Sequence, residues 1–274
     1  MSTVFELTVR PRKGWLAVDF KEAYVYWELL AFLVWRDIKI RYRQTLLGGL
    51  WAVLQPFATM LIFSFVFNRL AHVQSDGPPY KLFAYAGLAP WTFFSTSVTQ
   101  SSNSLIANQQ LVSKVYFPRI FIPLGAIGAL LLDLVLSLGL FAAMLAYYRW
   151  PLTTAVFWLP VFMLSAVLAA AGMGLTLSAL NVSFRDVKYV VPFLVQMGLF
   201  LTPVIYPVRY VPQRLQILMG LNPMAGVVIG FRHALLGSPA SWDVIGLSLF
   251  TSAFLFISGL LIFRRMESRF ADII

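Results

Sequence analysis

An uncharged stretch of 20 residues, 48–67, constrains this chain more than any other feature, because it directly follows a strongly basic segment. An α-helix rises about 1.5 Å per residue, so this stretch spans ~30 Å, the thickness of the hydrocarbon core of a bilayer. In the preceding residues 24–45, Trp27, Val34 and Ile38 fall on one helical stripe, with basic residues on the far side. We therefore predict an amphipathic helix over 24–45 that lies at the membrane interface and leads into a transmembrane helix over 48–67.

The composition extends this prediction to the whole chain. It is 59% hydrophobic and only 12% charged, whereas roughly a quarter of the residues of a soluble domain are charged. Backbone polar groups in lipid must be paired within the segment, which favours helices. We expect one all-α transmembrane domain over 1–274, with six membrane-spanning helices at 48–67, 82–100, 120–147, 155–180, 190–206 and 244–263.

Three further segments do not read as spans. Residues 1–23 are polar and form a predicted N-terminal cytoplasmic segment. The polar residues 104–116 have the composition of a cytoplasmic helix that docks on a partner. Residues 207–237 are rich in proline and glycine, and their apolar runs of about eight to twelve residues are too short to span a bilayer, so we predict external re-entrant half-helices.

The distribution of Lys and Arg sets the expected orientation. Of the 21 basic residues, 15 lie in 1–47, 101–119, 181–189 and 264–274, and six lie in the intervening loops and short segments. Cytoplasmic loops carry the excess of Lys and Arg, so both termini are expected in the cytoplasm. The net charge of +10 is explained by the membrane, without nucleic acid.

The sequence argues against an enzyme. It has no cysteine, its only histidines are His72 and His233, and no GxxxxGK(S/T) phosphate-binding loop occurs. No nucleophile, base and acid stand out as a catalytic set, and no metal-ligand cluster is expected. Transport is the favoured class of function.

The basic residues of the interface helix allow two interpretations. These residues are Arg36, Lys39, Arg41 and Arg43. They could only fix the topology, since each basic residue near anionic lipid contributes ~1 kcal/mol whatever its function. They could also receive the phosphorylated head group of a lipid-linked substrate. The sequence leaves both open.

Two sets of residues inside the spans are candidates for other roles. Asp133 is unfavourable in mid-span by roughly 2.5–3.5 kcal/mol and must face protein or water. With no basic residue expected at its depth, we predict a structural polar anchor rather than a charge relay. Six aromatic residues are, by depth alone, candidates for lining a sugar-conducting channel: Phe63, Tyr85, Trp91, Phe94, Phe200 and Tyr206.

Six motifs, in order, resemble one family. They are WRDIKIRYRQTLLGGLWAVLQP at 35–56, PYKLFAYAGLAPWTFF at 79–94, NQQLVSKVYFPR at 108–119, ALNVSFRDVKYVVPFLVQ at 179–196, LTPVIYP at 201–207 and LNPMAGVVIGFRHALLG at 221–237. The chain is similar to the membrane subunits of ABC-2 type exporters of O-antigen, capsule and teichoic-acid polysaccharides. The N-terminal segment 1–23 is longer than this pattern.

The resemblance implies a homodimer of this permease with two separate ATPase subunits, which hold ATP and Mg²⁺, so that this chain needs no cofactor. It implies a lipid-linked polysaccharide as substrate, a location in the bacterial inner membrane, and an entrance beside 24–45. It also implies that 104–116 is the coupling helix, whose candidate contacts are Asn108, Gln109, Gln110, Ser113 and Lys114. The alternatives are an ABC-2 permease for drugs or small lipids and, less favoured, a secondary transporter.

Overall fold

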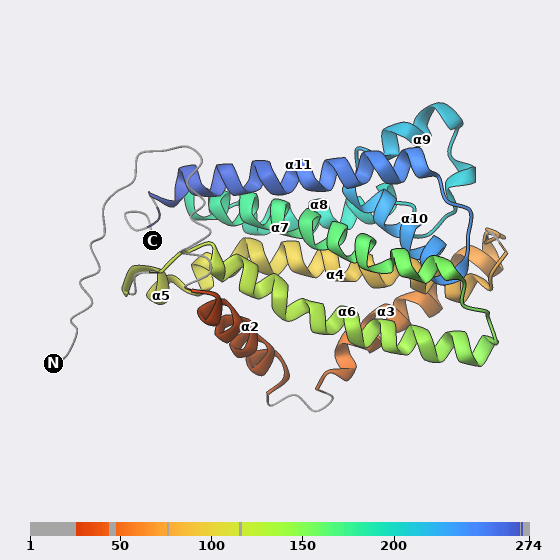
Figure 1. The fold of residues 1–274 in the computed structure, drawn as a ribbon, viewed down its shortest axis with the longest axis horizontal. Coiled ribbons are helices and arrows are strands. Elements are labelled where there is room, and N and C mark those ends of the chain that lie inside the picture. The colour runs from red at the N-terminus through yellow and green to blue at the C-terminus, as the bar shows by residue number, and fades with distance from the viewer. Residues whose placement is uncertain (1–25, 44–47, 76, 115–116, 269, 271–274) are drawn as a thin grey trace.

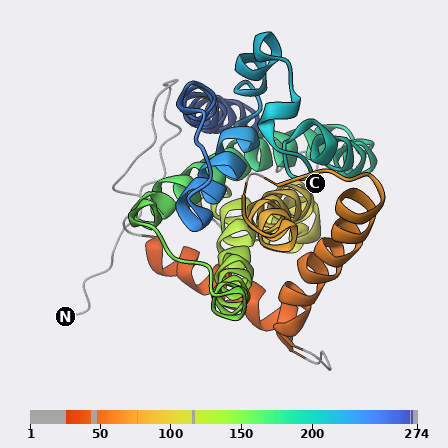
Figure 2. The same cartoon turned by 90° about the vertical axis from the view of Figure 1, so that its right-hand side faces the viewer.

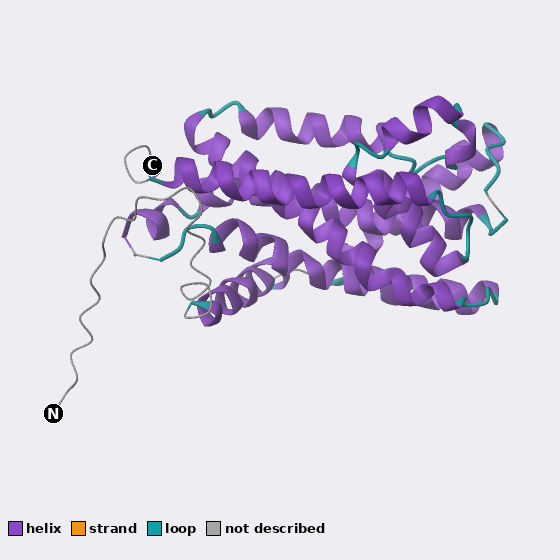
Figure 3. Cartoon of the chain, turned by 45° about the horizontal axis from the view of Figure 1, so that its top comes forward, coloured by secondary structure: helices purple, strands orange, loops and turns teal. Residues whose placement is uncertain are grey.

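The structure is a computed structural model that describes residues 26–43, 48–75, 77–114, 117–268 and 270. These residues form helices and connecting loops (Figure 3), which confirms the all-α class for the described part of the chain. The predicted N-terminal segment 1–23 lies outside the described residues, as do 24–25 and 44–45 of the predicted interface helix and 115–116 of the predicted coupling helix.

Four long helices lie lengthwise beside one another (Figure 1). They are α4 (Tyr80–Ala107), α6 (Phe121–Tyr148), α7 (Leu159–Ser183) and α11 (Trp242–Glu267). Helix α4 packs on both α6 and α7, and α7 packs on α11. Seen end-on, α4 is enclosed by its neighbours (Figure 2), and residues along most of its length are buried. The hydrophobic core is therefore built around α4.

Shorter helices complete the two ends. Helices α2 (Trp27–Tyr42) and α5 (Gln109–Lys114) lie towards the end where α11 finishes, and α9 (Gln213–Met219) lies at the opposite end (Figure 1). Helix α3 (Leu50–Phe63) continues into a π-helix, η1 (Ser64–Leu70), and α8 (Val187–Leu201) packs against α4.

Four helical segments of the described chain are long and apolar enough to cross a bilayer: Leu50–Leu70, Phe121–Tyr148, Thr154–Ser183 and Trp242–Glu267. Each overlaps one predicted span. Helix α4 is long enough but more polar, and α8, with 15 residues, is shorter than the predicted 190–206. Six spans therefore remain a prediction.

The boundaries of α4 differ from those predicted. The sequence indicated a span at 82–100 followed by a separate helix at 104–116, whereas α4 is continuous to Ala107 and α5 contains only Gln109–Lys114. In its polar half, hydroxyl and amide groups donate to carbonyl oxygens of the preceding turn, so these polar groups are paired within the helix. Thr99 Oγ1, for example, donates to the oxygen of Ser95 at 2.8 Å, and Asn103 Nδ2 donates to that of Thr99 at 2.9 Å.

Glycine allows α7 and α11 to touch at the backbone. A β-carbon added to Gly172 would lie 2.4 Å from the carbonyl carbon of Leu255, and one added to Gly259 would lie 2.2 Å from the oxygen of Gly172. Small residues permit such close approach of helices, which in lipid is stabilised by van der Waals packing. The small-residue run at 169–174 thus positions α11.

The predicted re-entrant region 207–237 contains a short 3₁₀ helix, η3 (Val208–Tyr210), then α9 and the buried α10 (Pro223–Leu236). Asn222 caps α10 by accepting from the amide of Met224 at 3.0 Å, and Gly237 ends it with a φ of 68°. Arg232 of α10 is 3% exposed and donates to the carbonyl oxygens of Phe83, Pro203 and Val204. It fastens α10 to α4 and to the loop after α8.

Candidate functional site

Helix α2 packs closely along the first part of α6. A β-carbon at Gly128 would lie 2.7 Å from Cγ2 of Val34, and one at Gly125 would lie 3.2 Å from Cβ of Leu33. Leu33 is 2% exposed as a result. Because the two glycines remove the side chains that would separate the helices, α2 runs beside α6 instead of being held only by lipid.

As a result of this packing, the C-terminal end of α2 lies beside Asp133. Arg41 Nη2 lies 2.8 Å from Asp133 Oδ2, and the Tyr42 hydroxyl donates a hydrogen bond to Asp133 Oδ1. Burial, followed by the bond to Asp133, raises the pKa of Tyr42 to about 12, so its hydroxyl stays a proton donor at physiological pH. The expectation that no basic residue reaches the depth of Asp133 is wrong, because α2 delivers Arg41 to it.

The other three candidate head-group residues lie elsewhere on α2. Arg36 pairs with Asp37, the nitrogen and oxygen being 2.8 Å apart, and Lys39 Nζ lies 5.3 Å from the ring centroid of Trp35. Lys39 and Arg43 are exposed. At 100° per residue, Arg36 and Lys39 share a side that Arg41 does not. The structure thus separates the predicted basic patch into one inward arginine and an outer group.

A cavity of about 120 Å³ lies beside the Arg41–Asp133 pair, where α2, α3, α4 and α6 meet. Polar groups of three helices face it, namely Gln55 of α3, Thr92 and Thr96 of α4, and Ser137 of α6. Trp51 and Phe93 supply apolar walls. Such a volume with several polar partners accommodates water or polar ligand groups.

The cavity adjoins a polar face of α4, which shares Thr92 and Thr96 with it and which the sequence did not indicate as a site. Its members recur at three- and four-residue spacing and are partly or fully exposed: Thr92, Ser95, Thr96, Thr99, Gln100 and Asn103. The hydroxyls of Ser95, Thr96 and Thr99 donate to carbonyl oxygens of α4 itself. Their oxygen lone pairs therefore remain able to accept hydrogen bonds from another molecule. In the sequence, the unusual polarity of span 82–100 could have indicated this face. The direction in which its polar side chains point depends on the packing of α4.

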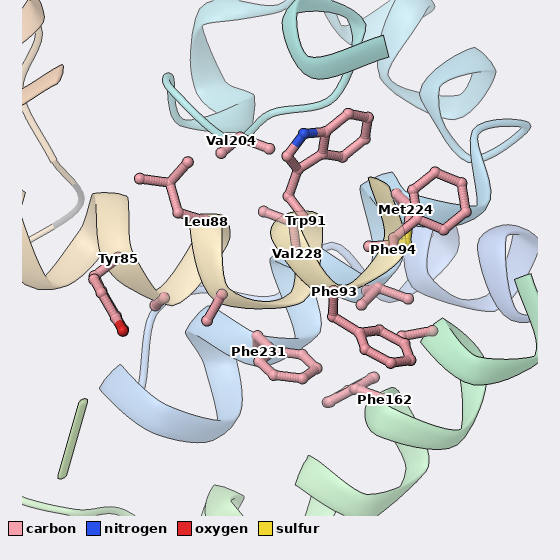
Figure 4. Packing of buried hydrophobic residues seen from close by; sticks show 14 of the residues in the cluster. Tyr85, Leu88, Trp91, Phe93, Phe94, Phe162, Val204, Met224, Val228 and Phe231 are labelled. Carbon is pink, nitrogen blue, oxygen red and sulfur yellow. The ribbon is translucent and has the colours of Figure 1, made fainter. Parts of the chain in front are cut away.

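The six candidate aromatics are not brought together. Tyr85, Trp91 and Phe94 are at most 7% exposed and lie in the core of the protomer. Figure 4 shows Trp91 directed towards Val204 and Phe94 beside Met224. These three have a packing role in this structure.

The remaining aromatics are nearer the surface. Phe200 is 59% exposed, and the Tyr206 hydroxyl donates to its carbonyl oxygen at 3.2 Å. Phe63 is partly exposed and makes an edge contact with Phe67, their centroids 5.6 Å apart. Lining of a channel by any of the six stays a prediction.

Helix α5 presents polar side chains to its surroundings and buries one apolar residue. Gln109, Gln110, Ser113 and Lys114 are exposed, while Asn108 ends α4 and donates to the oxygen of Ser104 at 2.8 Å. Val112, only 2% exposed, belongs to a second hydrophobic cluster that also contains Leu33 of α2. A displacement of α5 is thus connected through packed side chains to α2.

No group of three His, Asp or Glu side chains that could hold a metal is present among residues 26–43, 48–75, 77–114, 117–268 and 270. The polar groups described above can bind and position another molecule.

Comparison with known proteins identifies the family. The model of the ABC-2 type transporter family matches residues 28–236. The chain belongs to the ABC-2 type transporter family. This ABC-2 chain is 30% identical over 248 residues to an O-antigen export system permease protein RfbA of Klebsiella pneumoniae, covering 90% of this chain and 95% of the relative.

Two further relatives are named for polysaccharide transport. An O-antigen export system permease protein RfbA of Myxococcus xanthus is 34% identical, with 77% of this chain and 82% of that protein aligned. The polysialic acid transport protein KpsM of Escherichia coli is 27% identical, with 85% and 91% aligned. The family match covers α2, the cavity, the polar face of α4 and α5, so the ABC-2 assignment includes the candidate site.

Proposed function

We propose that this chain is the permease subunit of an ATP-driven exporter that moves a lipid-linked polysaccharide across the bacterial inner membrane. Membership of the ABC-2 family and similarity to O-antigen and polysialic acid transport proteins support this assignment. The chain itself has no phosphate-binding loop, so ATP hydrolysis is assigned to separate ATPase subunits that bind ATP and Mg²⁺.

The observation that carries the proposal is the polar face of α4. Hydroxyl and amide groups are unfavourable against lipid, so a partly exposed row of them along a long helix indicates a polar path. Sugar hydroxyls donate hydrogen bonds, and the Ser and Thr oxygens of this face are free to accept them after donating to their own helix. A row of equivalent hydrogen-bond acceptors lets a polymer move along the helix without being held at one position.

The proposed topology has six spans with both termini in the cytoplasm. Helices α3, α6, α7 and α11 supply four, and α4 and α8 supply the second and fifth. The polarity of α4 follows from its place beside the substrate path. Helix α8 is short because Thr202, which precedes Pro203, has an extended backbone. In this arrangement α9 and α10 form the external region, and the Arg41–Asp133 cavity lies towards the cytoplasmic side.

Mechanistically, the exposed residues of α5 contact the ATPase, and closure of the ATPase on ATP displaces α5. The buried Val112 transmits this movement to Leu33 and so to α2. Movement of α2 along α6 opens the contact between Arg41 and Asp133 and widens the cavity. The outer cations Arg36, Lys39 and Arg43 receive the phosphorylated head group, and the glycan follows the polar face of α4 between two copies of the permease.

Photo-crosslinking tests the assignment of this face. A photoreactive amino acid at Thr99, on the polar face, is compared with one at Val135, which is 55% exposed on α6 but apolar. In cells that synthesise the lipid-linked glycan, Thr99 is expected to give a permease–glycan adduct and Val135 only lipid adducts. Equal labelling at both positions, or adducts with small amphiphiles alone, would contradict a polysaccharide path.

A further inference from the structure

A second, apolar cavity lies at the C-terminal end of α6, away from the polar path. Its volume is about 480 Å³, within the range of small-molecule sites in proteins. One face of α6 forms its wall, from Leu138 through Ala142 and Ala146 to Arg149, at intervals of three and four residues. Val156 and Leu235 contribute from the segment before α7 and from α10. The two alanines leave the space that larger side chains would fill.

The length of this groove matches one leaflet of a bilayer. From Leu138 to Arg149, at about 1.5 Å per residue, the wall extends ~16 Å, half of the ~30 Å hydrocarbon thickness. Helix α6 ends at Tyr148, and Trp150, which also lines the groove, donates its indole N–H to the carbonyl oxygen of Leu236 at 3.2 Å. Aromatic residues at the end of a spanning helix mark the head-group level. The groove therefore runs from head-group level into the hydrocarbon.

Charge is confined to the head-group end. Arg149 is exposed and is the charged residue among those that line the groove, whereas the deeper part is lined by aliphatic and aromatic side chains. A glycan would find few hydrogen-bond partners there. A helix of a second protein, at ~10 Å across, would need more than about a thousand Å³ over this length. One slender apolar chain with an anionic head fits both the shape and the charge.

We propose that this groove binds one acyl chain of a bilayer phospholipid, whose phosphate lies against Arg149. The site is in the leaflet at which α6 ends, the outer leaflet in the topology proposed above, and it does not depend on the identity of the exported substrate. The bound lipid fills the space between α6, the start of α7 and α10, and so supports the buried helix that Arg232 fastens to α4.

Binding of phosphatidylglycerol to the full-length permease, purified with its ATPase and delipidated, tests the site by native mass spectrometry. Two variants address it independently: Ala146→Phe fills the groove, and Arg149→Gln removes the charge. Ala143→Phe is the matched control for the first, because Ala143 is also exposed on α6 but does not line the groove. Arg69→Gln is the control for the second, as an exposed cation outside it.

The expected result is one tightly retained lipid per chain in the wild type and both controls. Ala146→Phe abolishes its retention, and Arg149→Gln weakens it by about fivefold, the effect of one basic residue near an anionic lipid. Arg149→Lys restores most of the affinity. Unchanged retention in Ala146→Phe, or equal loss in Ala143→Phe, overturns the proposal, and so does a groove occupied by another protein chain in the purified complex.

Discussion

The contact between Arg41 and Asp133 provides the sharpest energetic prediction. The Arg41 side chain is 29% exposed and that of Asp133 is 13% exposed, so the pair lies between two known limits. Breaking a fully buried ion pair costs about 3–5 kcal/mol, and an exposed pair contributes about 0–1 kcal/mol. For Arg41→Met we expect a loss of about 2 kcal/mol, because Asp133 keeps the hydrogen bond from Tyr42.

A double-mutant cycle isolates this interaction. Unfolding free energies of the wild type, Arg41→Met, Asp133→Asn and the double variant are measured by SDS titration of the purified protein in mixed micelles. The two changes are expected to be non-additive by about 1–2 kcal/mol, and the reversed pair Arg41→Asp with Asp133→Arg is expected to recover part of the loss.

Arg36→Met is the matched control for this cycle. Arg36 pairs with Asp37 on the same helix and does not join α2 to α6, so the change is expected to cost less than about 1 kcal/mol. Additivity of Arg41→Met and Asp133→Asn within about 0.5 kcal/mol would refute the reasoning, since it would mean that α2 is not held to α6 by this pair.

Four further predictions address packing, coupling and pH. Arg232→Met leaves three buried carbonyls, one in α4 and two in the loop after α8, without their donor and is expected to lower stability by about 3–5 kcal/mol, measured by the same titration. Gly172→Leu is expected to prevent assembly of α7 with α11, seen as loss of folded protein on size-exclusion chromatography. Gly139→Leu is expected to be tolerated, because a β-carbon at Gly139 meets no atom within 4 Å. Val112→Ala is expected to leave ATPase binding intact but to reduce ATP-driven transport several-fold, because the exposed docking residues remain while the link to Leu33 is loosened. Because the folded-state pKa of Tyr42 is raised to about 12 from 10.0, its contribution to stability is constant below pH 10 and falls as the pH rises towards 12, and Tyr42→Phe is expected to remove this alkaline loss.

Much of the fold followed from charge and length. Long apolar runs located α3, α6, α7 and α11, because a helix of that length with no charge, or with Asp133 alone in α6, has few alternatives to a membrane. The family motifs were likewise confirmed by the match over 28–236. Boundaries were less accurate at α4, whose polar second half looked like the end of a span. Its hydroxyl and amide side chains donate hydrogen bonds to carbonyl oxygens of α4 itself, and hydropathy values do not take such bonds into account.

The candidate site was predicted only in part. The approach of Arg41 to Asp133 depends on how Gly125 and Gly128 let α2 lie against α6, and the sequence does not specify which helix meets those glycines. Depth alone also selected Trp91 and Phe94 as candidates for a channel, although α4 turns them into the core and turns outward the hydroxyls of its polar face, from Thr92 to Thr99. The rotation of a helix about its axis is set by packing partners, which periodicity identifies poorly when both faces are apolar or small.

Reconstituted transport shows whether this permease moves a lipid-linked glycan when its ATPase hydrolyses ATP. The permease and its ATPase are placed in vesicles of defined phospholipid with the lipid-linked glycan, and movement of glycan between leaflets is followed with and without ATP. We expect ATP-dependent movement whose rate falls several-fold when Thr92, Thr96 and Thr99 are changed to Val, with the complex still assembled. Movement of glycan without the ATPase, or undiminished movement in the triple variant, would contradict it.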